Sequence, residues 1–200
     1  MKVFLFDTET TGIQSKNEYV MQFASIMIEI LDNNKYIILE NYNKYIQIPN
    51  ANCISPQAFN VHHISYEMCS NPNNPTELEL CQYFAEKIQQ CQYIVGFNLA
   101  FDLDRMMSQL FERNKQKLGG NLYQIMPKNI IQLCLMKDTK KLFPMIYKKQ
   151  NEIDDYHKPL KLAELYFLLF AKEFNAHDAN EDIQATLHCF SYLWNLELFA

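Results

Sequence analysis

The segment VFLFDTETTGI, residues 3–13, places two carboxylates at the end of an apolar run. Residues 2–7 have the continuous apolar character that is expected of a central strand covered on both faces. Asp7 and Glu9 stand two positions apart, so both side chains leave the same face of the sheet. Two carboxylates this close repel each other unless a cation lies between them or one takes up a proton. The segment is therefore either a surface turn closed by its own hydroxyls or a metal site.

The composition is that of one domain with a sizeable core. The chain has 200 residues, of which 48% are hydrophobic and 14% aromatic, and we expect a single domain over residues 1–200. Its 18 Lys and Arg residues against 23 Asp and Glu residues give a net charge of −5. This acidic balance argues against binding of nucleic acid by general electrostatic attraction, but it leaves room for a local basic groove or for acids that bind metal.

The cysteines and the apolar runs bear on the cellular location. The six cysteines form no Cys-x-x-Cys pair and no regular framework, which favours reduced thiols. No apolar run approaches the length of a membrane span, and the run at the N-terminus is too short for a signal peptide. We therefore expect a soluble intracellular protein, cytoplasmic, nuclear or viral and not secreted, with no membrane partner.

The order of the predicted elements indicates an α/β fold. Apolar, β-branched and aromatic runs predict the strands, and the turn signal DNNK (32–35) joins the second to the third. The first three strands are expected to be antiparallel neighbours in a mixed sheet of about five strands flanked by helices. The expected strands are residues 2–7, 19–31, 36–48, 93–97 and 129–136.

Capping residues predict where the helices begin and end. Ser55 stands before Pro56, Thr76 opens a capping box, and Gly119 follows a segment with helical periodicity. A variable lysine-containing loop is expected near 137–158. Helices are expected from residue 55, from 76 to about 90, and over 101–118, 159–172 and 178–198.

A second acidic feature lies in VGFNLAFDLDRM, residues 95–106. A predicted strand ends at Phe97, and Asp102 follows within the first turn of a helix. The ligand crevice of an α/β sheet lies beyond the strand ends, so Asp102 is a candidate to share the site of Asp7. The alternative is an acid that the helix dipole favours at an N-terminus, an explanation that also covers Asp104.

A third feature lies in HDANEDIQATLHCF, residues 177–190. Asp178 and Glu181 have capping-box spacing, which predicts a helix that starts at about 178. His177 and Asp182 are five residues apart, so inside one helix their directions would diverge by about 140°. His177 must lie on the loop before the helix if it shares a site with Asp182. The alternative is an exposed histidine beside a helix cap.

Taken together, these residues resemble the three motifs of the DEDDh 3′→5′ exonucleases, the DnaQ-like branch of the ribonuclease H-like fold. The resemblance covers nearly the whole chain and implies a ribonuclease H-like mixed sheet. Phe97 and His63 depart from the family pattern, at positions that concern the substrate pocket rather than the metals. The matches are FDTETTG (6–12), FNLAFD (97–102) and HDANED (177–182), with weaker similarity at 54–65 and 161–170.

The resemblance implies a two-metal phosphodiester hydrolase. Two Mg²⁺ or Mn²⁺ ions, about 3.5–4 Å apart, would bind oxygen ligands from Asp7, Glu9, Asp102 and Asp182. His177 would take the proton from the attacking water. The substrate would be the 3′ end of single-stranded nucleic acid, and the products nucleoside 5′-monophosphates. A polymerase or another replication or repair protein is a candidate partner.

The resemblance also assigns residues to the substrate. Backbone amides near Thr10 and Gly12 would hold the terminal nucleotide, and Phe101 would stack on a base. Core packing explains Phe101 and Val61 equally well. Lysines of the expected loop are either contacts to the strand or part of a solvated surface. The residues assigned to substrate are Thr10, Gly12, Val61, His62, Asn98 and Phe101, and the lysines are Lys140, Lys141, Lys148 and Lys149.

Three alternatives remain open at this stage. The motif DTETTG resembles DNA proofreading members more than RNA-trimming ones, so the resemblance favours DNA; an RNA-trimming exoribonuclease of the same fold is the first alternative. A catalytically silent module that binds nucleic acid or a polymerase is the second, although all five expected catalytic groups are present. A haloacid-dehalogenase-type phosphatase also begins with an apolar strand and Asp-x-Asp-x-Thr, but NEIDDYHK (151–158) matches its later acidic motif poorly.

Overall fold

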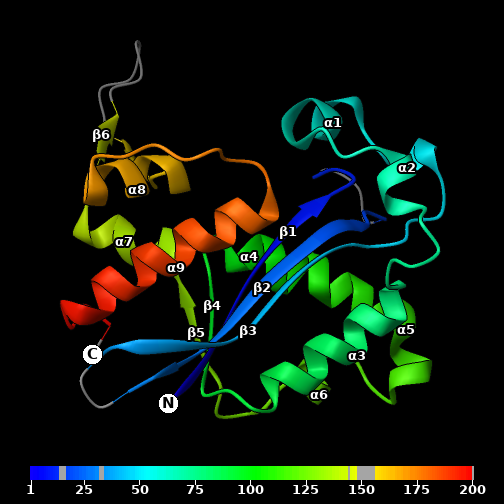
Figure 1. Cartoon of the computed structure of the whole chain (residues 1–200), viewed down its shortest axis with the longest axis horizontal. Coiled ribbons are helices and arrows are strands. Elements are labelled where there is room, and N and C mark those ends of the chain that lie inside the picture. The colour runs from blue at the N-terminus through cyan, green and yellow to red at the C-terminus, as the bar shows by residue number, and fades with distance from the viewer. Residues whose placement is uncertain (14–16, 32–33, 144, 148–155, 200) are drawn as a thin grey trace.

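A five-stranded sheet in the order β3-β2-β1-β4-β5 forms the centre of the molecule (Figure 1). The computed structural model describes the chain except for residues 14–16, 32–33, 144, 148–155 and 200. β1 pairs antiparallel with β2, and β2 pairs antiparallel with β3, whereas β4 and β5 continue the sheet in parallel with β1. The predicted mixed sheet with three antiparallel strands first is confirmed. The strands are β1 (Lys2–Thr10), β2 (Val20–Ile30), β3 (Tyr36–Tyr45), β4 (Tyr93–Gly96) and β5 (Ile131–Cys134).

β1 is buried on both faces, as its continuous apolar run predicts. Val3 and Leu5 point into one apolar cluster, and Phe4 and Phe6 point into another on the opposite face. All four side chains are fully buried. Because the side chains of a strand alternate between faces, Asp7 continues the face of Val3 and Leu5.

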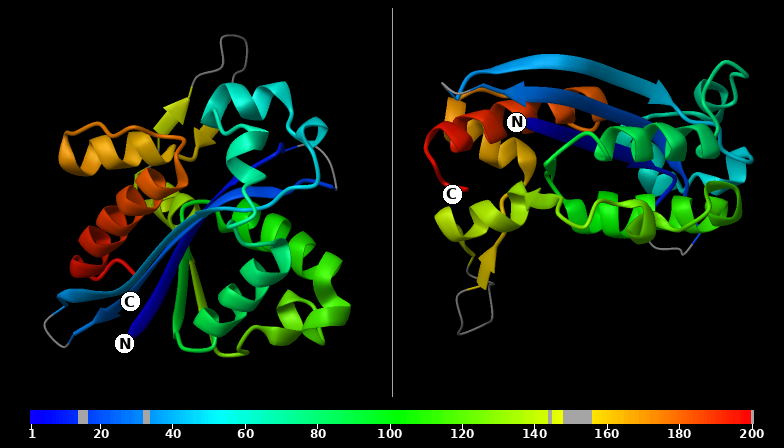
Figure 2. Two further views of the ribbon diagram at one scale, coloured as in Figure 1. Left: turned by 45° about the vertical axis from the view of Figure 1, so that its right-hand side comes forward. Right: turned by 90° about the horizontal axis from the view of Figure 1, so that it is seen from below.

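Helices cover the two faces of the sheet (Figure 2). α3 (Glu77–Ile88) and α5 (Ser108–Leu118) lie over the face of Phe4 and Phe6, and α8 (Leu162–Phe170) and α9 (Ala179–Asn195) lie over the face of Val3 and Leu5. Within the described residues, every helix is too short or too polar to cross a bilayer. The remaining helical segments are η1 (Ala51–Cys53), α1 (Pro56–His62), α2 (Tyr66–Cys69), α4 (Leu99–Phe101), η2 (Asp102–Met107), α6 (Leu122–Ile125) and α7 (Leu135–Leu142).

The predicted caps are present where the sequence indicated them. The side chain of Ser55 accepts a hydrogen bond from the backbone of Ala58, with Pro56 at the first helical position of α1. Thr76 forms the capping box that opens α3. Gly119, with φ of 77°, ends α5 in the left-handed conformation that glycine adopts without steric cost.

The helix predicted over 101–118 starts earlier and changes its winding. It begins with α4 at Leu99, passes through η2, which is a π-helical segment, and continues as α5. A π-helical turn has looser winding than an α-helix and is frequent at functional sites. Here it carries Asp102, the acid of the second motif, at its first position.

The prediction of a lysine-containing loop near 137–158 is wrong in part. α7 occupies its first residues, and β6 (Met145–Tyr147) pairs antiparallel with β7 (Tyr156–Lys158). The side chain of Asp138 accepts a hydrogen bond from the backbone of Cys134 at 3.0 Å, which ends the strand predicted over 129–136 and starts the helix. Lysines separate the apolar positions of this helix in the sequence; among its described side chains, Leu135 and Thr139 are buried. Lys148 and Lys149 lie outside the described residues.

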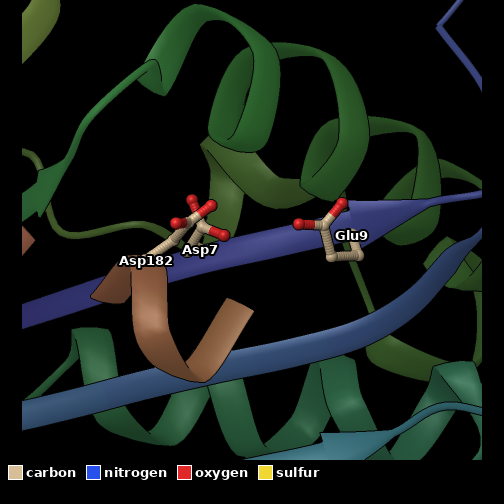
Figure 3. A group of neighbouring side chains, drawn as sticks. All are labelled: Asp7, Glu9 and Asp182. Atoms are coloured by element: carbon tan, nitrogen blue, oxygen red, sulfur yellow. The ribbon is translucent and has the colours of Figure 1, made fainter. Parts of the chain in front are cut away.

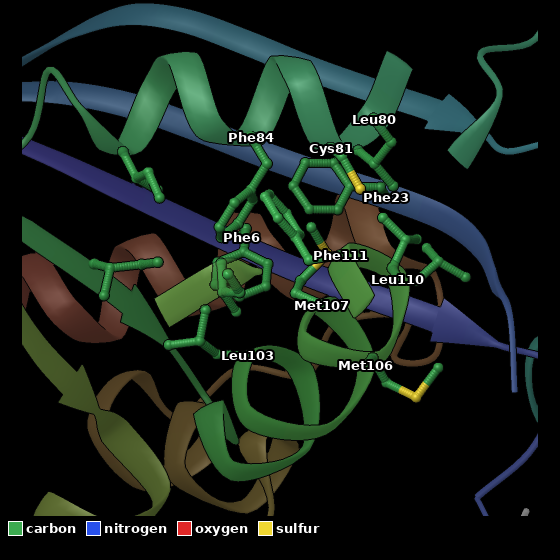
Figure 4. Close-up of a cluster of buried hydrophobic side chains, with 14 of the residues drawn as sticks. Phe6, Phe23, Leu80, Cys81, Phe84, Leu103, Met106, Met107, Leu110 and Phe111 are labelled. Atoms are coloured by element: carbon green, nitrogen blue, oxygen red, sulfur yellow. The ribbon is translucent and has the colours of Figure 1, made fainter. Parts of the chain in front are cut away.

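The cluster beneath α3 and α5 contains a connected group of phenylalanine rings among leucine, methionine and cysteine side chains (Figure 4). The ring of Phe84 has its centroid 5.6 Å from that of Phe4, 5.1 Å from Phe6, 6.1 Å from Phe23 and 6.0 Å from Phe111. All four contacts have edge-to-face geometry, which favours aromatic pairs beyond the area that they bury. Phe84 lies on α3 and therefore links this helix to β1, β2 and α5.

We expect Phe84→Ala to lower the free energy of unfolding by about 3–5 kcal/mol, because the substitution removes these contacts and leaves a cavity. Urea denaturation followed by circular dichroism measures the loss. The matched control is Phe167→Ala in α8, where the side chain is 54% exposed. We expect this control to change stability by no more than about 0.5 kcal/mol. Equal losses in the two variants would contradict the central position of Phe84.

Candidate active site

Three carboxylates from two ends of the chain meet at the carboxyl end of β1 (Figure 3). Asp7 and Glu9 project from β1, and Asp182 projects from the first turn of α9. One oxygen atom from each of the three side chains lies within 4.8 Å of the other two. The meeting follows from the alternation along β1, because Asp7 and Glu9 share the sheet face on which α9 packs.

Asp102 approaches the same place from the neighbouring strand. β4 runs parallel to β1, so the segment that follows β4 emerges at the edge where Asp7 and Glu9 lie. The Asp102 side chain is only 4% exposed, and its Oδ1 accepts a hydrogen bond from Oγ1 of Thr8 at 2.6 Å. Its charge raises the pKa of both Asp7 and Glu9, although its oxygens are not part of the three-carboxylate group.

Burial and mutual repulsion raise the pKa of every acid in this cluster. Burial is the largest cause at each residue, and the charges of the neighbouring acids add to it at Asp7 and Glu9. The pKa of Asp7 lies well above its ordinary value, and that of Glu9 is raised to about 8. Burial raises the pKa of Asp102 to about 7, against the lowering effect of Thr8. Burial likewise raises the pKa of Asp182 to about 6.

The donor set fits a divalent cation. All four acids offer oxygen atoms, which are the ligands that Mg²⁺ and Mn²⁺ prefer. Oδ1 of Asp182 is buried and has no hydrogen-bond partner among the described residues. Within the described part of the chain, no lysine or arginine forms a salt bridge with any of these acids. A cation at this position would therefore bind an oxygen that the protein leaves unsatisfied and would offset the repulsion.

His177 lies on the loop immediately before α9, at the position that its spacing from Asp182 predicts. Its side chain is exposed, and its backbone adopts φ of 75°. The backbone N–H of His177 donates to Oδ2 of Asp182 at 3.3 Å, which ties the loop to the acid cluster. The charge of His177 also lowers the pKa of His62, so the two imidazoles belong to one electrostatic neighbourhood.

A pocket of about 190 Å³ opens beside Glu9. Its walls come from the end of β1, the following loop, α1 and α4. Five of the six residues assigned to substrate line this pocket. Asn98 does not line it; the backbone carbonyl of Asn98 instead accepts from the N–H groups of Phe101 and Asp102 where the helix begins. The lining residues are Thr8, Glu9, Thr10, Gly12, Ile13, Ser55, Gln57, Ala58, Val61, His62 and Phe101.

His62 uses both ring nitrogens within the protein. Nδ1 accepts a hydrogen bond from the backbone N–H of Ile64 at 2.9 Å, so Nε2 carries the proton and donates to the carbonyl of Thr10 at 3.1 Å. Burial lowers the pKa of His62, which favours this neutral form. His62 therefore holds α1 against the end of β1, and its contribution to the pocket is a wall rather than a nitrogen directed at a ligand.

Thr8 is the site residue that the sequence reasoning missed. It stands between Asp7 and Glu9, is 6% exposed, and donates to Asp102 from the opposite side of the strand. The sequence signal for Thr8 was a hydroxyl between two acids at a strand end. The same pattern also fits a turn that is closed by its own side chains. Only the parallel pairing of β4 with β1 shows which acid that hydroxyl meets.

The sequence matches a family model for exonucleases of the RNase T type over residues 4–190. A search of curated proteins found no significant match. The structure resembles E. coli exonuclease I in complex with a dT13 oligonucleotide, with a TM-score of 0.76, 19% identity and coverage of 99% of this chain and 42% of that chain. Exonuclease I from Methylocaldum szegediense matches with a TM-score of 0.69, 17% identity and the same coverage.

These likenesses to solved structures establish the fold. A further match is a complex of exonuclease I with SSB and the inhibitor CFAM, with a TM-score of 0.72, 15% identity and coverage of 99% of this chain and 43% of that chain. The present chain thus spans less than half the length of the solved structures that it matches.

The cluster predicts that the metal-free protein loses stability as the pH rises. Between pH 4.5 and about 8 the folded protein holds a proton on Glu9 that the unfolded chain has released, so the free energy of unfolding falls across this window. We expect a lower melting temperature in EDTA at pH 8 than at pH 5.5, by about 2–4 °C for each kcal/mol lost. Differential scanning calorimetry of the wild type and Glu9→Gln measures the effect.

Glu9→Gln should remove part of this pH dependence, whereas Glu112→Gln, which changes an exposed acid far from the cluster, should leave it unchanged. Addition of Mg²⁺ should raise the melting temperature more at pH 8 than at pH 5.5, because protonated carboxyl groups do not bind the ion. An equal response of the wild type and Glu9→Gln to Mg²⁺ would argue against a metal site here.

Proposed function

The chain belongs to the RNase T family of exonucleases, and from this membership we propose that it removes nucleotides one at a time from the 3′ end of single-stranded DNA. The membership confirms the sequence-based resemblance to the DEDDh exonucleases. The observation that carries the proposal is the juxtaposition of an acidic cluster with an open pocket, because Glu9 belongs to both.

The acids are proposed to hold two divalent cations, Mg²⁺ or Mn²⁺. Asp7, Glu9 and Asp182 would supply most of the ligand oxygens, and Asp102 would act directly or through water. Bound cations of this kind neutralise charge on the phosphate and make a nucleophile from water near neutral pH. The protein contributes fixed positions for these groups, since Asp102 is held by Thr8 and the backbone of His177 is held by Asp182.

His177 is proposed as the general base. The backbone of His177 is hydrogen-bonded to Asp182, and its imidazole is exposed. The imidazole can therefore accept a proton from a water that attacks the phosphate beside Asp182. His62 is the other histidine near the cluster, and its two ring nitrogens are already bonded to the backbone. The geometry thus favours His177 over His62 for proton transfer.

The pocket is proposed to hold the terminal nucleotide. Val61 is 48% exposed and Phe101 is partly exposed, so both offer apolar surface on which a base can stack. The carbonyl of Gly12 accepts a hydrogen bond from Oγ1 of Thr10, which shapes the loop at the pocket edge. Single-stranded DNA is favoured as the substrate because the similar exonuclease I structures hold dT13 and dA16 oligonucleotides.

Three further expectations rest on the sequence or on similar proteins. A replication or repair partner is proposed, with the SSB complex of an exonuclease I as the supporting example. An intracellular location and a single domain over residues 1–200 are likewise proposals from the sequence.

Substitution of the acids tests the site. We expect Asp7→Asn and Asp182→Asn to reduce release of mononucleotides by at least about 10³-fold, because each removes charge from the metal site. Asp102→Asn should also be severe, whereas the matched control Asp104→Asn, two residues along the same helix and bonded to Tyr123, should retain activity within about twofold. Release is measured from a labelled oligonucleotide in Mg²⁺ or Mn²⁺, with EDTA as the blank.

His177→Ala should lower kcat by about 10²–10⁴-fold while leaving metal binding intact, because only the proton acceptor is lost. Isothermal titration with Mn²⁺ and single-turnover kinetics separate the two properties. Unchanged kcat in this variant would remove His177 from the mechanism. A wild-type protein without any metal-dependent release would indicate the silent nucleic-acid-binding module instead.

Substrate class is tested with matched oligonucleotides. We expect linear single-stranded DNA to be degraded faster than RNA of the same sequence, and circular single-stranded DNA to be resistant because it has no 3′ terminus. Time courses on denaturing gels measure the three rates in parallel. Faster cutting of RNA would favour the exoribonuclease alternative, and cutting of the circle would exclude an exonuclease mechanism.

A further inference from the structure

Gln22 is a polar residue in the middle of a buried strand. β2 has the burial pattern of a core strand, and the Gln22 side chain is only 1% exposed. A buried amide without hydrogen bonds destabilises the folded protein. The hydrogen-bond partners of Gln22 therefore indicate its structural role. The partners of Gln22 lie on β3 and at the start of α9.

All the polar atoms of the Gln22 side chain are engaged. Nε2 donates to Oδ1 of Asn43 at 3.1 Å and to Oδ2 of Asp178 at 3.1 Å, while Oε1 accepts from the backbone N–H of Ala179 at 3.3 Å. The carboxylate of Asp178 can only accept and the N–H of Ala179 can only donate, so the chemistry of the partners sets the orientation of the amide. Asp178 in turn caps α9 by accepting from the backbone N–H groups of Asn180 and Glu181.

This side chain connects two parts of the acidic cluster. Gln22 pairs directly with Glu9 across the antiparallel ladder, so their side chains stand next to each other on one face of the sheet. At the other end of the link, the backbone N–H of Asp182 donates to the carbonyl of Asp178 at 2.9 Å, one helical turn into α9. The register of the ladder shifts immediately beyond Glu9. The regular register therefore ends beside Gln22, and pairing continues with Thr10 opposite Val20.

We propose that Gln22 is a positioning residue that holds the start of α9, with His177 and Asp182, in register with Asp7 and Glu9. The inference rests on the proposed function, because it takes these residues as the metal ligands and the general base. The apolar contacts of α9 bind the helix to the sheet but are compatible with small slides along it. Directional hydrogen bonds from one buried amide to the helix N-terminus resist such a slide.

Gln22→Met tests the proposal by keeping the volume of the side chain and removing its hydrogen bonds. We expect kcat to fall about 10–100-fold, the range typical for residues that orient metal ligands. KM for the oligonucleotide should change less than threefold, because Val61 and Phe101 of the pocket lie on other elements. The Mg²⁺ concentration for half-maximal activity should rise in parallel with the loss of kcat.

Ser25→Ala is the matched control on the same strand. Ser25 is also 1% exposed, but its hydroxyl meets Tyr83 of α3, on the opposite face of the sheet from α9. We expect this control to retain kcat within about twofold, even if its stability falls as much as that of Gln22→Met. Melting temperatures of both variants show that the assays compare folded proteins.

An exchange of donor and acceptor provides the sharpest test. Gln22→Glu places a carboxylate against that of Asp178, so its kcat should be lower than that of Gln22→Met. Adding Asp178→Asn restores one donor and one acceptor to the pair, and asparagine still caps a helix well. The double variant should therefore recover at least tenfold in kcat over Gln22→Glu.

Two results would overturn the proposal: a Gln22→Met kcat equal to that of the Ser25→Ala control, or a double variant no more active than Gln22→Glu. Metal binding keeps this test separate from the proposed function. If the wild type releases no nucleotides, the rise in melting temperature on addition of Mn²⁺ replaces kcat as the measure. Gln22→Met should then reduce that rise, Ser25→Ala should not, and an equal rise in all three proteins would contradict the positioning role.

Discussion

The burial and mutual repulsion of four carboxylates at one edge of the sheet form the constraint on which the site depends. Burial and neighbouring charge raise the pKa values of Asp7, Glu9, Asp102 and Asp182, so the protein must supply free energy to bring these groups together. The apolar clusters on the two faces of the sheet offset this cost. The arrangement lowers the stability of the metal-free protein, and such a loss is expected at a functional site.

The topology explains why the acids meet at a single edge. β1 and β4 are parallel neighbours, so residues at and after their carboxyl ends share one crevice. α9 returns from the far end of the chain and packs on the face of the sheet toward which Asp7 and Glu9 point. The hydrogen bond from Thr8 to Asp102 and the bonds of Gln22 to the start of α9 then act on opposite sides of β1. The site is thus held from β1 on one face of the sheet and from β2 on the other.

The sequence was most informative where local chemistry decides the structure. The strand of residues 2–7, the caps at Ser55 and Thr76 and the helix end at Gly119 all follow from neighbouring residues, and the structure contains each of them. The segment near 137–158 was mispredicted because α7 is short and rich in lysine, and its amphipathic pattern begins inside the strand that was predicted over 129–136. β6 and β7 were also missed, because each strand has only three residues and gives no strand pattern of its own.

The sequence by itself determined which chemical groups the protein has and to which family it belongs. It contains the acids, the histidine and their spacing along the chain, and these were sufficient to identify the exonuclease family. Only the tertiary structure decided how the groups are held: Asp102 is bonded to Thr8, both ring nitrogens of His62 are bonded to the backbone, and Asn98 lies outside the pocket lining. The physical reason is that residue type and local spacing set which groups are available, whereas hydrogen-bond partners and burial depend on strand order and helix packing between distant segments.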